Sequence, residues 1–219
     1  MTRVEELYQQ YVVAHDLERS GLFEALRERY DPAATVLYPG CFLHITPSFS
    51  FQYIVYVDRN ELARSFFADA EDVLQLIKER KQYRQQPYVR FIDQDFTKPL
   101  PVPEASFGLL LSLYAPGISR SCASYLKIGG ILLTNDHQGD AAEAAADKNL
   151  ELIAVVKERR GSYEFSDEDL EEYLIPKRPQ RAAAGTQRTL GRPDYARTAD
   201  YYVFRRVRPT PSPQRATQR

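Results

Sequence analysis

The segment 35–60 constrains the fold of this chain more than any other part of the sequence. It contains two runs of β-branched and aromatic residues, TVLY at 35–38 and YIVYV at 53–57. The first run ends at Pro39-Gly40 and the second at Asp58. Short continuous apolar runs are typical of strands that are buried on both faces of a parallel sheet, and ligands of such sheets bind outside the carboxyl ends of the strands. The segment therefore predicts the first crevice of an open α/β sheet.

Strand-like and helix-like patterns alternate along the rest of the chain. Helical spacing predicts helices within 3–30, and five more apolar runs follow, at 88–92, 107–113, 131–134, 150–156 and 201–207. Further helical patterns separate these runs, except that a proline-rich loop at 97–105 joins the first two. This alternation favours a doubly wound, mostly parallel sheet of seven strands with helices on both faces. The last two runs are suited to pair as an antiparallel edge. Ser166 and Asp169 have the spacing of a capping box, which predicts a helix that ends near Leu174.

The patterns divide the chain into three parts. Residues 1–32 are predicted to form an N-terminal helical cap, and residues 33–208 are predicted to form the sheet domain. Within that domain, 176–199 has little periodicity and is expected to be a long loop, whereas 209–219 is expected to be a disordered tail. A length of 219 residues fits one domain with a sizeable core.

The charge balance makes nucleic acid an unlikely partner. The net charge is −1 and the isoelectric point is about 6.3, so the chain lacks the overall basic footprint of nucleic-acid-binding proteins. Basic residues do gather late in the chain, as KRPQR at 177–181 and RRVR at 205–208. Such a cluster is typical of a solvated face with a basic tail.

Cysteine and histidine usage favours a reducing compartment and no metal site. Cys41 and Cys122 are too few for a disulfide framework, and we expect unpaired thiols. Neither the cysteines nor the three histidines have metal-ligand spacing. The N-terminal sequence MTRVEELYQQ is charged rather than signal-like, and no apolar run approaches about 18 residues. We therefore expect a cytoplasmic protein without membrane spans.

Polar, aromatic and proline residues follow the predicted strands where those strands end. These residues are Pro39 to Cys41, Asp58-Arg59, Asp93 to Phe96, Ser112 to Pro116 and Asn135 to His137. Because the carboxyl ends of parallel strands meet at one edge of the sheet, we expect them to surround one site. Each one alone is also a common cap or turn former.

Two carboxylates in this set have roles that suit a nucleoside. Asp58 closes the second strand and can accept both hydroxyl protons of a ribose, although an N-cap role is the alternative. Asp95 can face an exocyclic amine while Phe96 flanks a purine ring, and a turn before Thr97 is the alternative there.

The order of these motifs resembles the class I S-adenosylmethionine-dependent methyltransferases. The likeness covers about 33–207 and rests on VLYPGCFLH, YVD at 56–58, DQDF at 93–96, FGLLLSLYAPG, LKIGGILL and the late strand YYVFRRV. It implies a Rossmann-like methyltransferase fold with an antiparallel last strand, and S-adenosylmethionine as cofactor. The cofactor-binding positions that it implies are Tyr38, Pro39, Gly40, Cys41, His44, Asp58, Arg59, Asp95, Phe96 and Ser112.

The first turn departs from the pattern of this family. Tyr38 stands where the family usually has an acidic residue, and Phe42 and His44 stand where further glycines are usual. Glycine lets a backbone approach a ligand closely and adopt positive φ. Only Gly40 remains, so either a reshaped pocket or no pocket is expected.

His137 is the candidate general base, with Asp136 and Tyr114 as further candidate catalytic residues. A hydrogen-bonded loop histidine is the alternative for His137. The leading hypothesis is methyl transfer to a small-molecule acceptor, which needs little acid–base machinery. Two alternatives remain open: an enzyme that cyclises or cleaves the aminocarboxypropyl arm of the cofactor, and a non-catalytic partner that binds protein or RNA.

Overall fold

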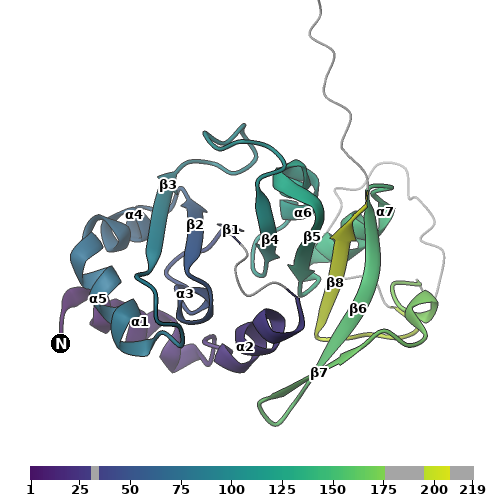
Figure 1. Ribbon diagram of the computed structural model, residues 1–219, viewed down its shortest axis with the longest axis horizontal. Helices are drawn as coiled ribbons and strands as arrows, with labels where there is room; N and C mark the ends of the chain where they lie inside the picture. Colours follow the sequence, from purple (N-terminus) through teal and green to yellow (C-terminus); the bar gives the residue numbers. More distant parts are fainter. Residues whose placement is uncertain (31–34, 176–194, 208–219) are drawn as a thin grey trace, which may run out of the picture.

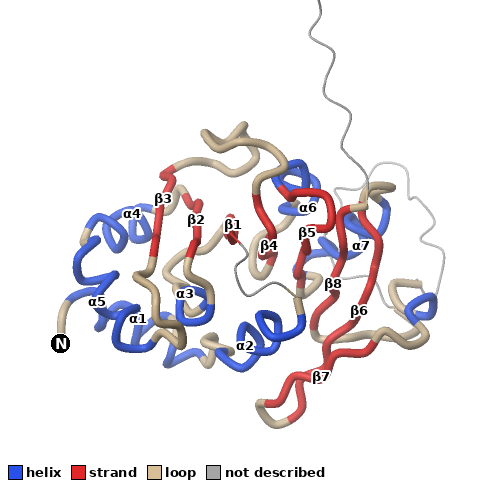
Figure 2. The backbone as a smooth tube through the Cα atoms, viewed as in Figure 1, coloured by secondary structure: helices blue, strands red, loops and turns tan. Residues whose placement is uncertain are grey.

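The computed structural model describes residues 1–30, 35–175 and 195–207 (Figures 1 and 2). The strands are β1 Thr35–Pro39, β2 Tyr53–Asp58, β3 Tyr88–Asp93, β4 Phe107–Ser112, β5 Leu126–Thr134, β6 Leu150–Arg159, β7 Ser162–Ser166 and β8 Tyr201–Arg206. The α-helices are α1 Arg3–Tyr11, α2 Ser20–Arg29, α3 Pro47–Ser50, α4 Glu61–Ala68, α5 Ala70–Arg80, α6 Ile118–Cys122 and α7 Asp140–Ala146. Most of the predicted loop at 176–199 and all of the predicted tail at 209–219 lie outside the described residues.

All eight strands belong to one sheet, in the order β3-β2-β1-β4-β5-β8-β6-β7. The pairs from β3 through β5 are parallel. In contrast, β8 is antiparallel to both β5 and β6, and Figure 2 shows it lying between these two strands. The predicted class of fold, a mostly parallel sheet with an antiparallel last strand, is confirmed. The predicted antiparallel pairing of the strands at 150–156 and 201–207 is confirmed as well.

The predicted number of strands, seven, is wrong by one. The segment after β6 turns back at Arg160 and Gly161, which both have positive φ (53° and 81°), and continues as β7. Two consecutive residues with positive φ are typical of a tight hairpin turn. The helix predicted from the capping box at Ser166 is also wrong, because Ser166 pairs with Val155 in the sheet. Only a 3-10 turn, Leu170–Glu172, follows it.

Apolar side chains cover both faces of the sheet, as continuous apolar strands require. On one face Val36, Tyr38 and their neighbours pack with residues of α1, α2, α4 and α5 in a single cluster. On the other face Leu37 and its neighbours pack with residues of α6 and α7. The N-terminal helices therefore share the main core with β1 rather than standing apart from it.

The β1–β2 connection, residues 40–52, is held by three buried tyrosines. The hydroxyl of Tyr38 lies 2.8 Å from Nδ1 of His44, that of Tyr8 lies 2.6 Å from Oγ1 of Thr46, and that of Tyr56 lies 2.6 Å from Oγ of Ser48. The tyrosines come from β1, α1 and β2, and their partners alternate along the connection. These bonds, together with Pro47 at the first turn of α3, explain why the connection contains a four-residue helix instead of a long one.

Tyr8→Phe is expected to lower the free energy of unfolding by about 1 kcal/mol, because the Thr46 hydroxyl then loses a buried partner and the Glu18 carboxylate loses a donor. The measurement is urea unfolding at neutral pH. Tyr11→Phe, on the same helix, is the matched control, since Tyr11 meets Phe42 through its ring, with centroids 5.5 Å apart. Equal losses in the two variants would show that the Tyr8–Thr46 bond does not stabilise the connection.

Candidate functional site

A pocket of about 490 Å³ lies at the carboxyl ends of β1 to β4. We call it the strand-end pocket. Segments that are far apart in sequence meet there, as expected for the topological edge of an open α/β sheet. Its walls are formed by Gly40, Phe42, Asp58, Arg59, Asn60, Gln94, Asp95, Phe96, Thr97, Tyr114, Ala115 and Pro116.

Six of the thirteen residues predicted for the site line this pocket. They are Gly40, Asp58, Arg59, Asp95, Phe96 and Tyr114. The remaining seven are absent from its walls: Tyr38, Pro39, Cys41, His44, Ser112, Asp136 and His137. The structure thus brings together the residues predicted from the ends of β1, β2 and β3, and one residue that follows β4.

Gly40 lines the pocket directly after β1, where the chain approaches Ala115 in the segment after β4. Its φ is 63°, and its amide donates to the carbonyl oxygen of Val57 at 2.8 Å. A Cβ atom at this position would lie 2.6 Å from Cβ of Ala115, closer than non-bonded carbon atoms approach. Both the backbone conformation and the available space therefore require glycine here.

The carboxylate of Asp58 joins the first turn to the end of β2. Its Oδ2 accepts from the amide of Phe42 at 2.8 Å, and its Oδ1 accepts from the amide of Asn60 at 2.9 Å. An ionised carboxylate has about four acceptor positions, so each oxygen retains one that these two amides do not use. The N-cap of α4 is Asn60, whose Oδ1 accepts from Leu62.

Asp95 is held as an ionised group in the turn after β3. Its Oδ1 accepts from the amide and the hydroxyl of Thr97, at 2.9 and 2.8 Å. Its Oδ2 lies 3.2 Å from Nη1 of Arg59. The hydrogen bond from the Thr97 amide, followed by that from its hydroxyl, lowers the pKa of Asp95. The turn that was the alternative interpretation is therefore present, and the residue still lines the pocket.

The two residues that replace glycines differ in their surroundings. Phe42 has φ of 48° and lies in the pocket wall, where the edge of Tyr11 supports its ring. His44 is 4% exposed, with Nδ1 facing Tyr38 and Nε2 lying 3.5 Å from the carbonyl oxygen of Glu18. Burial lowers the pKa of His44 to about 4. His44 is thus a neutral interior group, whereas Phe42 reshapes the pocket.

Ser112 and Tyr114, at and after the end of β4, have different surroundings. Ser112 is fully buried and donates to Oδ2 of Asp140 at 2.5 Å, and Asp140 also accepts from the amide of Ser119. Tyr114 lines the pocket, and its buried hydroxyl has no hydrogen-bond partner within the described residues. The guanidinium of Arg19 lies 5.5 Å from the centroid of its ring.

Asp136 and His137 lie after the end of β5, outside the pocket walls. Asp136 is buried, and its Oδ1 accepts from the amide of Ala141 at the start of α7. The backbone amide of His137 donates to Oδ1 of Asn135, and its Nε2 lies 3.3 Å from Nε2 of Gln138. The structure therefore does not bring these two residues together with Gly40 and Asp58.

Six residues of the pocket walls are not among the thirteen site residues predicted from the sequence. They are Phe42, Asn60, Gln94, Thr97, Ala115 and Pro116. Gln94, Ala115 and Pro116 belong to the strand-end segments that were expected to surround the site. Phe42, Asn60 and Thr97 each directly follow such a segment, so extending the segments by one residue would have included them. All six are uncharged, and none has a side chain with an obvious chemical role.

Comparisons with known proteins concern the fold. No model of a known protein family matches the chain, and no curated protein matches it. A tRNA methyltransferase from Aquifex aeolicus is 15% identical with a TM-score of 0.47, over 87% of this chain and 69% of that one. A putative methyltransferase from Methanococcus maripaludis is 18% identical with a TM-score of 0.40, over 60% and 61%. The YcgJ protein from Bacillus subtilis is 22% identical with a TM-score of 0.39, over 53% and 49%. The chain thus spans about half to two thirds of these proteins, and its fold assignment rests on its own strand order.

Proposed function

We propose that this chain, which has the fold of the class I S-adenosylmethionine-dependent methyltransferases, binds S-adenosylmethionine in the strand-end pocket and transfers its methyl group to a small molecule. The observation that carries the proposal is the meeting of Gly40, Asp58 and Asp95 around one pocket of about 490 Å³. Three separate strand ends contribute these residues. Pockets of this size suit nucleotide-like ligands.

The residues present fit the cofactor. Gly40 lines the pocket and has no side chain to cover its main chain, so a ligand could approach its backbone closely. Asp58 would accept from the ribose hydroxyls through the acceptor positions that Phe42 and Asn60 leave open. Asp95 would accept from an exocyclic amine, and the ring of Phe96 would flank the base.

The bound cofactor would supply an activated methyl group on a sulfonium. The chain's own residues would then bind and orient the two reactants and exclude water, which accounts for much of the rate in such reactions. Phe42 and Tyr114, which line the pocket, would exclude water from it. Asp136 and His137 are outside the pocket walls, so we assign them no role in positioning the cofactor.

A small-molecule acceptor in the cytoplasm is the partner that this proposal favours. The N-terminal segment contacts two residues of the pocket wall. Tyr11 of α1 contacts Phe42, and Arg19, directly before α2, contacts Tyr114. An acceptor would therefore reach the cofactor beside these helices. Among the described helices, none combines the length and the apolar character that a membrane span requires.

Asp58→Asn is expected to weaken binding of S-adenosylhomocysteine about tenfold or more, because charge-assisted hydrogen bonds to the ribose are lost. Isothermal titration calorimetry with S-adenosylmethionine and S-adenosylhomocysteine measures this. Asp72→Asn, which changes a half-buried carboxylate of α5 outside the strand-end pocket, is the control. Thermal unfolding of each apo variant separates a binding effect from loss of the Phe42 and Asn60 bonds.

Absence of heat and of thermal stabilisation with either compound would contradict the proposal and its arm-cleaving alternative. It would favour the non-catalytic partner instead. Binding that is unchanged in Asp58→Asn would refute the ribose assignment alone.

A further inference from the structure

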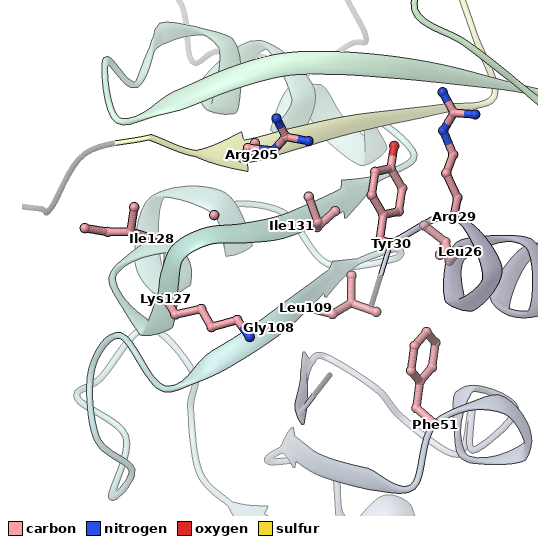
Figure 3. A pocket seen from close by; sticks show the side chains of 11 residues that line it. Leu26, Arg29, Tyr30, Phe51, Gly108, Leu109, Lys127, Ile128, Ile131 and Arg205 are labelled. Atoms are coloured by element: carbon pink, nitrogen blue, oxygen red, sulfur yellow. The ribbon is translucent and has the colours of Figure 1, made fainter. Parts of the chain in front are cut away.

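A second pocket, of about 360 Å³, lies toward the amino ends of β4 and β5, away from the strand-end pocket (Figure 3). The residues Leu109, Ile131 and Arg205 form its sheet side, and they are paired in register across β4, β5 and β8. The C-terminal end of α2 forms the facing wall with Leu26, Arg29 and Tyr30. The described residues that line the pocket are thus drawn from three strands, one helix and the segment after α3.

Positive charge gathers on one side of this pocket. Figure 3 shows the side chain of Tyr30 between those of Arg29 and Arg205. The hydroxyl of Tyr30 is buried and has no hydrogen-bond partner within the described residues. Burial raises the pKa of Tyr30, and Arg29, through its contact with the hydroxyl and its charge, opposes that rise more than the charge of Arg205 does, whereas Asp167 adds to the rise. Both guanidinium groups are therefore close enough to act on the same hydroxyl.

The nearby carboxylates neutralise this charge only in part. Asp167 lies 3.8 Å from Nη2 of Arg29, and both of these side chains are largely exposed, so the pair is weak. Glu151 is the cross-strand neighbour of Arg205 on β6. Within the described residues, no carboxylate lies within ion-pair distance of Arg205. A buried hydroxyl that can donate, beside two guanidinium groups, is the donor set that carboxylates and phosphates prefer.

Most of the other side chains that line the pocket are apolar. Leu26, Phe51, Leu109 and Ile131 line the pocket, and Ile128 at its mouth is 59% exposed. Lys127 of β5 also lines it. An apolar cavity with a few convergent polar groups is the usual form of a small-ligand site.

We propose that this second pocket binds a small amphipathic anion, with its carboxylate or phosphate head group on Arg29, Arg205 and the Tyr30 hydroxyl and its apolar body against Leu26, Phe51 and Ile131. The site is separate from the strand-end pocket, with which it shares no lining residue. It therefore does not depend on the function proposed for that pocket.

The test is isothermal titration calorimetry of the full chain with three probes of equal chain length: octanoate, octyl phosphate and neutral 1-octanol. We expect at least one anion to bind more tightly than 1-octanol, and the tighter of the two identifies the head group. Arg205→Gln and Tyr30→Phe should each weaken binding of that anion about tenfold and leave binding of 1-octanol unchanged. Arg84→Gln, an exposed arginine outside both pockets, should change nothing.

Thermal unfolding of each variant shows whether it is folded, and titration with S-adenosylhomocysteine shows whether the strand-end pocket is intact. Failure of wild-type protein to bind either anion would overturn the proposal, as would 1-octanol binding as tightly as the anions. So would unchanged anion affinity in a folded Arg205→Gln variant. None of these outcomes bears on whether S-adenosylhomocysteine binds.

Discussion

Gly40→Ala is expected to lower the free energy of unfolding by about 3 kcal/mol and to abolish binding of S-adenosylmethionine. A left-handed conformation costs an alanine about 1–2 kcal/mol. The new Cβ would also lie 2.6 Å from Cβ of Ala115, and overpacking of this kind costs about 1–3 kcal/mol. Chemical unfolding and calorimetric titration measure the two effects.

Two further variants separate the backbone effect from the steric one. Gly161 has a similar φ, 81°, and a Cβ atom added there would have no atom within 4 Å. Gly161→Ala should therefore lose only the part of the unfolding free energy that comes from the left-handed conformation. In the double variant Gly40→Ala with Ala115→Gly the close contact is removed, and part of the lost stability should return. Equal losses for Gly40→Ala and Gly161→Ala would mean that β1 and β4 do not approach as closely as described.

The second large effect is a dependence of the free energy of unfolding on pH, which arises from His44. Burial lowers the pKa of His44 to about 4 in the folded protein, whereas the pKa of an unfolded histidine is about 6.5. Between these values the unfolded state binds more protons, so stability falls as the pH is lowered from 6.5 to 4. At about 1.36 kcal/mol per pK unit, the loss attributable to His44 is about 3 kcal/mol.

The measurement is the free energy of unfolding of wild-type protein and His44→Gln across this pH range. The variant should be less stable at pH 7, because it disturbs the contacts with Tyr38 and Glu18, and its stability should fall less steeply below pH 6.5. His15→Gln removes an exposed histidine and controls for the substitution itself. Parallel profiles for wild-type protein and His44→Gln would contradict a buried, neutral His44.

The sheet was predictable because its strands are apolar on both faces. Runs such as FGLLLS in β4 are buried along their entire length. The apolar sequence of such a run therefore predicts directly that it forms a buried strand. β7 was missed because its residues are half-buried or exposed and Ser166 also suits a helix start. Whether this segment forms a strand or a helix depends on its pairing with β6. Such pairing involves residues outside the segment, so the local sequence pattern does not reveal it.

The site was predictable where strand ends supply charge and was not where the first turn folds back into the core. Asp58 and Asp95 follow directly from their places at the ends of β2 and β3. In contrast, the sequence places His44 beside Gly40, and only the packing of Tyr38 and the N-terminal helices directs it inward. The same packing leaves Phe42 in the pocket wall. The spacing of the two residues from Gly40 does not show which of them lines the pocket.

The most direct test of the central claim is a crystal structure of the chain with S-adenosylhomocysteine. We predict ligand density in the strand-end pocket, in contact with Gly40, Asp58 and Asp95. An empty strand-end pocket at a saturating ligand concentration, or density at another place such as the second pocket, would contradict it.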